Sequence, residues 1–434
     1  MGRMRRGKAV LALALLAGAA AFGRSGGMTV ERRAGAEESQ RPEPLPARYD
    51  LREAGAGPQI RDQGDQNACW AFAAAAALET SMEEGMRTTL SADHMLHKNS
   101  FGLPEDSGGD YSIAWAYVLS WQGPVAEDSD PYGDHVSPEG LSPVCHVQTV
   151  KLLGEKDYNA IKRAVYETGG VQSSLYLPEQ GSRDRSAYFY DGDKEANHDV
   201  VIVGWDDSYS RERFSPQPES DGAFLCANSW GEDFGDRGFF YVSYEDTQIG
   251  RHNVSYAGVE DTEHYSRIFQ TDLCGWTGQL GYGKEEVWCA NVYESGEKGT
   301  VEAAGFYATV PDTEYALYGA AVPEEMEARE LLSGLEGGSM PLLASGRLGE
   351  AGFYTIPFEA PVETGPESRF AVALWIRSPG TVQPAAIEYN GGERSGNVDI
   401  ADGEGYISPD GIQWMRAEER EACNVCLKAY GNGV

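Results

Sequence analysis

A short stretch around Cys69 constrains the fold of this chain more than any other. The polar, turn-forming residues QGDQNA run directly into CWAFAAAAALE, a strong helix former with the thiol on its first turn. This helix is apolar on nearly every side, which predicts a buried element that holds the sulfur rigidly. Asn67 or Asp65 could cap it. A helix N-terminus favours a thiolate, so Cys69 is either an activated nucleophile or a small core residue.

Two later segments favour the nucleophile. The first, NHDVVIVGW, is a β-branched strand with His198 at its start, and the second, AFLCANSWG, is a strand that ends at Asn228. A lone histidine or asparagine is usually structural. Together, and in this chain order, the three residues match a known catalytic set. The cysteine at the helix start is the nucleophile, the histidine on the strand is its base, and the asparagine at the strand end orients the base. The sequence therefore predicts covalent catalysis by Cys69.

These segments resemble the papain-like cysteine peptidases (the papain/cathepsin family), and they are most similar to its secreted bacterial members. The family signature around the cysteine is C-G-[SA]-C-[WY], with histidine and asparagine about 130–150 residues downstream. Here A-C-W fits, His198 follows Cys69 by about 130 residues and Asn228 by about 160. The polar stretch 207–220 reads as a surface loop that explains the excess. The resemblance spans roughly residues 45–257.

The resemblance implies a role for each matching residue. Cys69 would be the nucleophile, and His198 would act as base and then as acid. Asn228 would orient the imidazole ring beneath Trp230, and Gln63 would supply an amide of the oxyanion hole.

Further along, Gly108 and Gly109 match the glycine pair whose backbone binds the substrate strand, so they and Trp230 are the expected substrate-binding residues. The stretch from Glu127 to Tyr132 resembles the family's E…YPY segment.

The chain departs from the family beside the nucleophile and beside the histidine. Gln66 and Asn67 stand where the family has cysteine and glycine, so the usual disulfide at this place is absent. Asp199 follows the histidine, where plant and animal enzymes carry a small residue. A carboxylate there would raise the pKa of the histidine and steady a thiolate–imidazolium pair, or else lie on the solvent side.

The N-terminus and the charge indicate the setting. A basic head, an apolar run over residues 9–22 and small residues near its end are typical of a signal peptide, which we place at 1–23. Residues 24–44 read as a short pro-segment or linker. The run is too short to span a membrane, so we expect no membrane insertion and a secreted or cell-surface protein. A net charge of −33 argues against nucleic-acid partners.

The other cysteines and the histidines give no metal site. Six cysteines remain besides Cys69, and Cys274 with Cys289, or a member of the Cys423–Cys426 pair, could form disulfides after export. A single C-x-x-C is not a zinc site. His94 and His97 lie three residues apart without a nearby glutamate of a zinc motif, so we interpret them as exposed helix histidines. No metal or cofactor is expected.

The length predicts more than one domain. We expect an α+β, papain-like two-lobe fold over residues 45–259, with a helical lobe followed by a β-barrel-like lobe. The predicted helices are the one that begins at Cys69, then 112–121 and 158–168, and the predicted strands are 171–176, 199–206, 223–230 and 239–244.

Residues 260–434 resemble the lectin-like β-sandwich that follows the peptidase in some secreted bacterial members. The strands that we expect are 287–293, 301–309, 315–322, 353–358, 370–376, 385–389 and 425–430, with a helical insert at 324–335. Trp414 is either a sugar-stacking residue or a structural one. A cell-surface glycan is a candidate partner of this domain by analogy alone.

These observations predict a secreted cysteine endopeptidase that cleaves protein or peptide substrates through a thioester. A catalytically silent binding protein and a transpeptidase on the same scaffold are the alternatives. Because the predicted catalytic residues all precede residue 260, we also expect the cleft to work without the sandwich.

Overall fold

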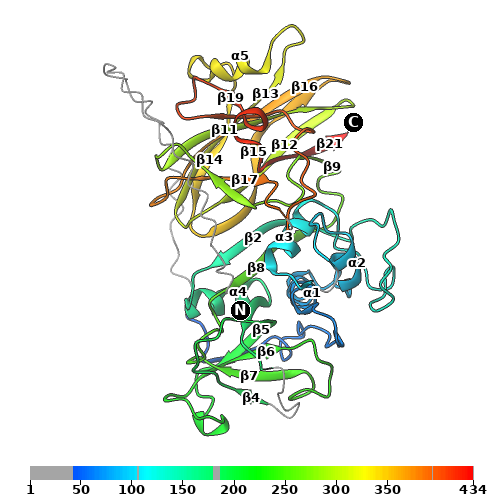
Figure 1. The fold of residues 1–434 in the computed structure, drawn as a ribbon, viewed down its shortest axis with the longest axis vertical. Coiled ribbons are helices and arrows are strands. Elements are labelled where there is room, and N and C mark those ends of the chain that lie inside the picture. The colour runs from blue at the N-terminus through cyan, green and yellow to red at the C-terminus, as the bar shows by residue number, and fades with distance from the viewer. Residues whose placement is uncertain (1–42, 105–106, 179–185, 393, 434) are drawn as a thin grey trace, which may run out of the picture. The chain divides into compact units, whose positions relative to one another are not determined.

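The helix that carries the predicted nucleophile is α1, Cys69–Ser81 (Figure 1). The computed structural model describes residues 43–104, 107–178, 186–392 and 394–433, so the predicted signal peptide and nearly all of the pro-segment lie outside the described residues. Helix α1 is buried along almost its whole length, as its all-round apolar sequence predicts. Its N-cap is Ala68, without a side-chain hydrogen bond. Capping by Asn67 or Asp65 was therefore a wrong prediction.

Three shorter helices follow in the first half of the chain: α2 (Ala92–His97), α3 (Tyr111–Leu119) and α4 (Tyr158–Glu167). Helix α3 begins where the Asp110 carboxylate accepts a hydrogen bond from the Ser112 amide at 2.8 Å. His94 is buried, and its Nδ1 lies 2.7 Å from the Tyr117 hydroxyl of α3. The prediction that His94 is exposed is wrong because α2 turns this face toward α3.

Apart from a short 3-10 helix at Arg211–Arg213, the other elements among the described residues of this half are strands. They are β1 (Arg48–Asp50), β2 (His146–Leu153), β3 (Val171–Leu175), β4 (Ala187–Tyr188), β5 (His198–Asp206), β6 (Ala223–Ala227), β7 (Phe239–Ser243) and β8 (Asn253–Glu260). Strand β5 pairs antiparallel with both β3 and β6 and lies inside the sheet. Its β-branched run is buried on both faces, which fixes the position of His198 at its first residue.

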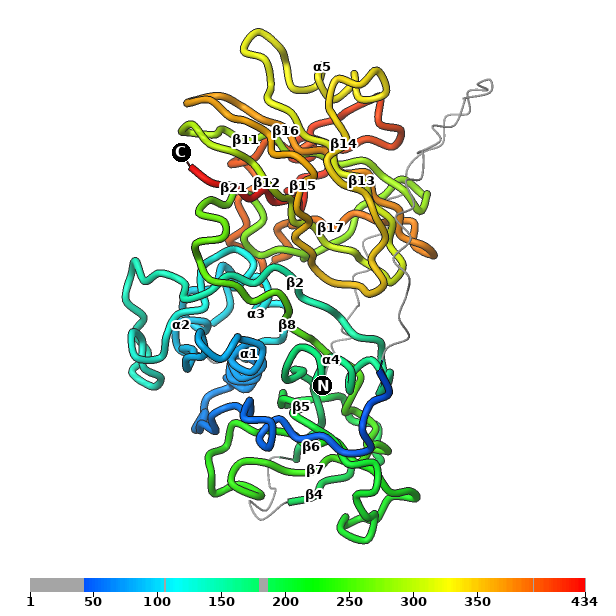
Figure 2. The backbone as a smooth tube through the Cα atoms, turned by 180° about the vertical axis from the view of Figure 1, so that it is seen from behind, coloured from blue at the N-terminus to red at the C-terminus, as the bar shows by residue number. Residues whose placement is uncertain are grey.

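Strands β2 and β8, which sequence reasoning missed, join the two halves of the chain. Strand β2 pairs with β8 on one side and with β15 (Ala351–Thr364) on the other. The sheet therefore continues from the first half into the second in the order β4-β7-β6-β5-β3-β8-β2-β15-β12-β21-β9. In Figures 1 and 2, β2 and β8 lie between the helices and the strands of the second half.

The second half is a β-sandwich. Its strands in the long sheet are β9 (Arg267–Phe269), β12 (Gly299–Ala308), β15 and β21 (Leu427–Gly433). A six-stranded sheet contains β11 (Glu286–Glu294), β13 (Thr313–Val322), β14 (Leu342–Leu348), β16 (Arg369–Arg377), β18 (Gly405–Ser408) and β19 (Met415–Arg416). A small sheet holds β10 (Gly278–Leu280), β17 (Ala385–Tyr389) and β20 (Cys423–Val425), and the helices are α5 (Ala328–Ser333) and α6 (Ala417–Glu421).

The two halves also share side-chain packing, so the cleft-bearing half does not end cleanly before the sandwich. The Trp115 and Tyr307 rings lie 5.8 Å apart, and the Trp121 and Tyr430 rings 5.6 Å apart. At the same boundary the Arg394 guanidinium pairs with Asp110 at 2.7 Å. Residues 45–434 form one compact unit. This packing counts against a cleft that works without the sandwich, and that expectation stays a prediction that only an activity measurement can test.

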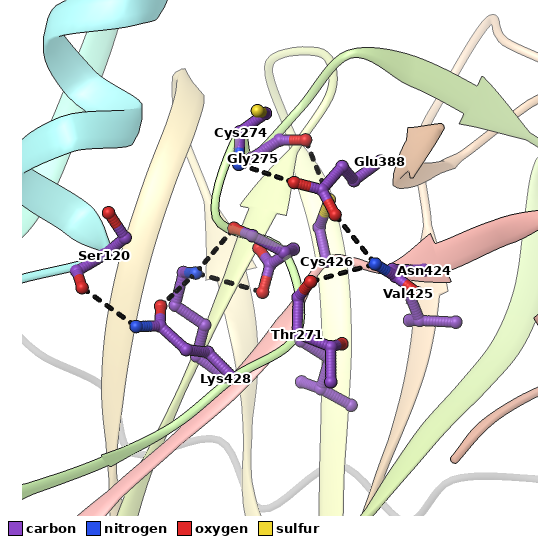
Figure 3. A network of polar contacts seen from close by, with 12 residues as sticks. Ser120, Thr271, Cys274, Gly275, Glu388, Asn424, Val425, Cys426 and Lys428 are labelled. Carbon is purple, nitrogen blue, oxygen red and sulfur yellow. Dashed lines mark hydrogen bonds and ion pairs between the residues drawn. The ribbon is translucent and has the colours of Figure 1, made fainter. Parts of the chain in front are cut away.

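A buried polar cluster lies at this boundary (Figure 3). Lys428 Nζ is 3.0 Å from an Asp272 carboxylate oxygen, and both side chains are almost completely buried. The Gln270 amide donates to the Ser120 carbonyl oxygen at the end of α3 at 2.8 Å. Glu388 accepts a hydrogen bond from Asn424 at 2.8 Å. The cluster therefore ties the first strand region of the sandwich to its last strands and to the helical part.

The structure answers two questions about single residues, the disulfide bonds and the role of Trp414. All seven cysteines are free, so neither Cys274 nor Cys289 forms the disulfide that export would permit. Trp414 is 4% exposed, and its indole N–H donates to the Gly411 carbonyl oxygen, so it is a structural residue and not a sugar-stacking one. Among the described residues, no helix is long and apolar enough to cross a membrane.

Candidate active site

Cys69 is the first residue of α1 and lines an open cleft. It is partly exposed, whereas the other six cysteines are buried. The same cleft is lined by Gln63, Gly108, His198 and Trp230. The cleft thus brings together residues that are far apart in the sequence. It also leaves one thiol within reach of a solute.

His198 stands at the first position of β5, and Asn228 directly follows β6. The His198 Nε2 atom is 2.7 Å from Asn228 Oδ1, an acceptor, so Nε2 carries a proton. In the neutral imidazole the other nitrogen, Nδ1, is then free of hydrogen and can accept a proton. The Trp230 ring lies 4.8 Å from the imidazole ring, centre to centre, and covers it. Asn228 and Trp230 therefore fix both the tautomer and the plane of the ring.

Gln63 is held from both ends of its side chain. Its Oε1 accepts a hydrogen bond from the Ser229 hydroxyl at 2.6 Å, and its Nε2 donates to the Gln66 carbonyl oxygen at 2.7 Å. Fixing Oε1 in this way determines which end of the amide is the donor. An amide nitrogen has two hydrogens, so one remains to serve an oxygen atom in the cleft. Sequence reasoning missed Ser229, although it directly follows the asparagine.

The loop before α3 forms the opposite wall of the cleft. Gly108 has φ +73°, a left-handed conformation that side chains rarely adopt. A Cβ on Gly109 would lie 2.6 Å from the Trp70 indole, so this position has no room for one. The predicted glycine pair thus presents a bare backbone beside Cys69. An extended peptide could pair with such an edge.

Burial dominates the charge states of the nucleophile and its base. It raises the pKa of Cys69 to about 11. The Asp199 carboxylate raises this pKa further, whereas hydrogen bonds from the backbone N–H groups of Asp199 and Trp70 lower it. Burial lowers the pKa of His198 to about 4, which the Asn228 hydrogen bond partly opposes. The thiol and the imidazole are each favoured in their neutral forms. Proton transfer between them creates both charges together, and each charge then stabilises the other.

Asp199 differs from the sequence expectation. Its carboxylate is buried and accepts hydrogen bonds from the Ser174 hydroxyl at 2.6 Å and the Gln172 amide at 2.9 Å. It acts on the pKa of Cys69 and not on that of His198. Burial raises the pKa of Asp199 itself. Both predicted roles, raising the histidine pKa and pointing to solvent, are therefore wrong.

A loop outside the cleft supports the Gln63 turn. The Tyr132 hydroxyl lies 2.8 Å from the Gln63 carbonyl oxygen and 2.6 Å from Gln66 Oε1, and it donates its one proton to one of these acceptors. Gln66 Nε2 is also 2.9 Å from His135 Nδ1. The E…YPY-like stretch is the one feature of the sequence that points to this support, and it does so only weakly.

The chain matches two known families. Residues 45–259 match the papain family of cysteine proteases, and residues 268–431 match a lectin like domain. The mouse (Mus musculus) cathepsin S is 26% identical over 237 residues, which cover 52% of this chain and 64% of that protein. Chicken (Gallus gallus) cathepsin K is 28% identical over 211 residues, 46% of this chain and 59% of that protein. The chain thus spans less than two thirds of these relatives.

A solved structure extends the similarity across both halves. The cysteine protease and lectin-like domains of Cwp84, a surface layer associated protein of Clostridium difficile, superpose with a TM-score of 0.76 at 24% identity. The match covers 90% of this chain and 90% of that one. This likeness shows a shared fold in which a papain-like half is followed by an all-β sandwich.

Proposed function

Because this chain belongs to the papain family of cysteine proteases and carries a lectin-like domain, we propose that it is a secreted cysteine endopeptidase that uses Cys69, His198, Asn228 and Gln63. The observation that carries this proposal is the 2.7 Å contact between His198 Nε2 and Asn228 Oδ1, in a cleft that the Cys69 thiol also lines. That contact leaves Nδ1 as the proton acceptor.

The first half of the reaction forms an acyl-enzyme. His198 takes the proton of the Cys69 thiol, and the sulfur attacks the carbonyl carbon of the peptide bond. The negative oxygen that develops accepts hydrogen bonds from the second hydrogen of the Gln63 amide and from the Cys69 backbone N–H. His198 then gives its proton to the leaving amine as the C–N bond breaks. The product is a thioester on Cys69 and a free amine.

The second half returns the enzyme to its starting state. His198 removes a proton from water, and the water oxygen attacks the thioester carbon. The C–S bond breaks, the sulfur recovers a proton from His198 and a carboxylic acid leaves. Asn228 holds the ring through both proton transfers, and Trp230 packs against it. Gly108 and Gly109 would pair with the substrate backbone.

The proposal includes the organisation of the whole chain. We assign residues 1–23 to a signal peptide, 24–44 to a short pro-segment, 45–259 to the peptidase and 260–434 to the lectin-like domain. Protein or peptide substrates follow from the family. Export and a cell-surface location follow from the sequence of the first residues, and a surface glycan as ligand of the sandwich remains an analogy.

The test is a peptide-library cleavage profile of the mature protein, measured beside the Cys69→Ala and His198→Ala variants. We expect both substitutions to abolish cleavage. Cys145→Ala, which removes a buried thiol, serves as the control and should retain activity. Adding a primary amine separates hydrolysis from peptide transfer, because a transpeptidase would give the amide product instead of the acid. Cleavage that persists in Cys69→Ala would reject the proposal, and an inert wild-type protein would favour the silent binding protein.

A further inference from the structure

Three carboxylates outside the cleft lie close enough to share one cation. Oxygen atoms of Asp93, Asp130 and Asp134 all lie within 4.8 Å of one another. Asp93 belongs to α2, and the other two lie at the ends of a short loop. Calcium binds oxygens at 2.3–2.6 Å, so two of its ligands can be up to roughly 5 Å apart. The spacing of the three side chains satisfies this limit.

Two of these side chains are buried, and each has one oxygen atom without a hydrogen-bond donor. Asp93 is 0% exposed and Asp130 is 1% exposed. The Oδ2 atom of each is buried and accepts no hydrogen bond. Buried carboxylate oxygens almost always have a partner, because leaving them without one is costly. These two atoms therefore point to a ligand of positive charge.

The protein groups around the cluster supply little of that charge. Asp93 Oδ1 accepts a long hydrogen bond of 3.4 Å from the Gly133 amide, and Asp93 Oδ2 is 3.8 Å from His97 Nδ1. Among the described residues, no lysine or arginine forms an ion pair with any of the three carboxylates. The three carboxylates lie against one another, with oxygen atoms within 4.8 Å, so their negative charges repel. Such mutual repulsion is what a bound divalent cation relieves.

The same loop holds the turn that carries Gln63. Tyr132 lies between Asp130 and Asp134 in the chain, and its hydroxyl contacts the Gln63 carbonyl oxygen at 2.8 Å. His135, next to Asp134, contacts Gln66 at 2.9 Å. One short loop thus supplies two carboxylates of the cluster and the side chains that contact the turn carrying Gln63.

We propose that Asp93, Asp130 and Asp134 bind one Ca²⁺ ion, with water completing its coordination, and that this ion braces the loop that positions Gln63. Calcium is preferred to magnesium because its coordination geometry is flexible, and side chains from two elements need not form a regular octahedron. Affinity in the range of extracellular calcium modules, a Kd of about 10⁻⁴–10⁻³ M, is expected for three carboxylates with one of them exposed.

Binding is tested on the full mature chain with Cys69→Ala, which prevents self-cleavage, after removal of metals with EDTA. Calorimetric titration with CaCl₂ should give one ion per chain, and 10 mM CaCl₂ should raise Tm by about 2–4 °C. Equal MgCl₂ should do less. Both effects should vanish in Asp93→Asn/Asp130→Asn and persist in Asp128→Asn, a matched control on the same loop whose side chain is exposed.

Calcium that stabilises the double variant as much as the parent would overturn the site, and so would an absence of heat with the parent. Should the double variant fail to fold, Asp134→Asn replaces an exposed ligand and is expected to weaken binding about tenfold. The bracing role rests on the proposed peptidase function and has its own readout. Calcium should raise kcat in the active protein with little change in KM, and this effect should be absent in Gln63→Ala. Binding without a change in kcat would overturn the bracing role alone.

Discussion

Two buried sites of this protein, one in each half, hold their ionisable groups with different kinds of partners. In the cleft, neutral partners hold the buried groups: Asn228 holds His198, and Gln172 with Ser174 holds Asp199. In the sandwich, Lys428 and Asp272 form an ion pair that is sealed from solvent (Figure 3). Neutral partners let a group gain or lose a proton during a reaction. A sealed ion pair fixes the charges, and it favours one arrangement of the strands around it.

The difference separates polar groups that do chemistry from polar groups that hold the structure. The cleft cluster is open to a solute through Cys69. The sandwich cluster lies against the end of α3 and has no such opening, because the Lys428 and Asp272 side chains are at most 1% exposed. Loss of the first cluster should therefore abolish the reaction and spare the fold, whereas loss of the second should do the reverse.

The largest effect is expected from removing the sandwich. A truncated protein that ends at Val259 loses β15, one of the two partner strands of β2, and uncovers rings such as Trp115. Each large apolar side chain that loses its burial costs about 1.5–3 kcal/mol, and a few of them exhaust a typical stability of about 5–15 kcal/mol. The truncated protein should be insoluble or inactive in a fluorogenic peptide assay. Residues 260–434 added in trans should rescue it, and a soluble truncation with kcat/KM within several-fold of the whole chain would show that the halves are independent.

Breaking the sealed ion pair should come next. Lys428→Met leaves Asp272 buried without its cation and should cost about 3–5 kcal/mol in the free energy of unfolding, measured with denaturant. Adding Asp272→Asn should restore part of this loss. Arg347→Ala, which breaks an exposed pair with Asp312 in the same sandwich, should cost at most about 1 kcal/mol. If both substitutions lowered the free energy of unfolding equally, the buried ion pair would contribute no more than the exposed one, and this contrast would fail.

The matching test in the cleft is Gln63→Ala. Deleting one donor to the oxyanion should lower kcat by about 10²–10³, with little change in KM. The unfolding free energy should change much less than in Lys428→Met, because the Gln63 side chain lines the cleft. Full activity in Gln63→Ala would dismiss its assigned role. A large loss of unfolding free energy in Gln63→Ala would instead show that Gln63 has a structural role.

A smaller effect is expected at Asp199, and it concerns pH. The Asp199 carboxylate raises the pKa of Cys69, so the neutral Asp199→Asn variant should have a lower thiol pKa. The pH profile of Cys69 alkylation should therefore move toward lower pH. Asp191→Asn, at an exposed position, should leave the profile in place. A shift toward higher pH would reverse the sign assigned to this charge.

Sequence reasoning located the parts of the site that have local patterns. Cys69 precedes an alanine-rich helix, and His198 and Asn228 adjoin β-branched or aromatic strands, so their positions follow from short-range propensities. The strand β2 (HVQTVKLL) lies in a sheet that two domains share, and its mixture of polar and apolar residues gives no clear strand pattern. Its partner β15 is about 200 residues away in the chain, and no local signal encodes such a pairing.

The same reason explains the errors on single residues. A cysteine pair is fixed by three-dimensional distance, so an even number of cysteines could not show that all of them are free. The support of Gln63 by Ser229 and Tyr132 depends on the meeting of three distant segments. Asp199 was recognised as unusual, but its orientation depends on Gln172 of a neighbouring strand.

The central claim is that His198 activates Cys69, and the rate of thiol alkylation at pH 6 tests it most directly. Exposure alone would favour labelling of Cys69, because the other cysteines are buried. The decisive comparison is therefore with His198→Ala, in which the thiol stays exposed and loses its base. We predict rapid labelling by iodoacetamide at Cys69 alone, located by mass spectrometry, and markedly slower labelling in His198→Ala. Equal rates in the two proteins, or equally fast labelling of Cys145 or Cys226, would contradict the account.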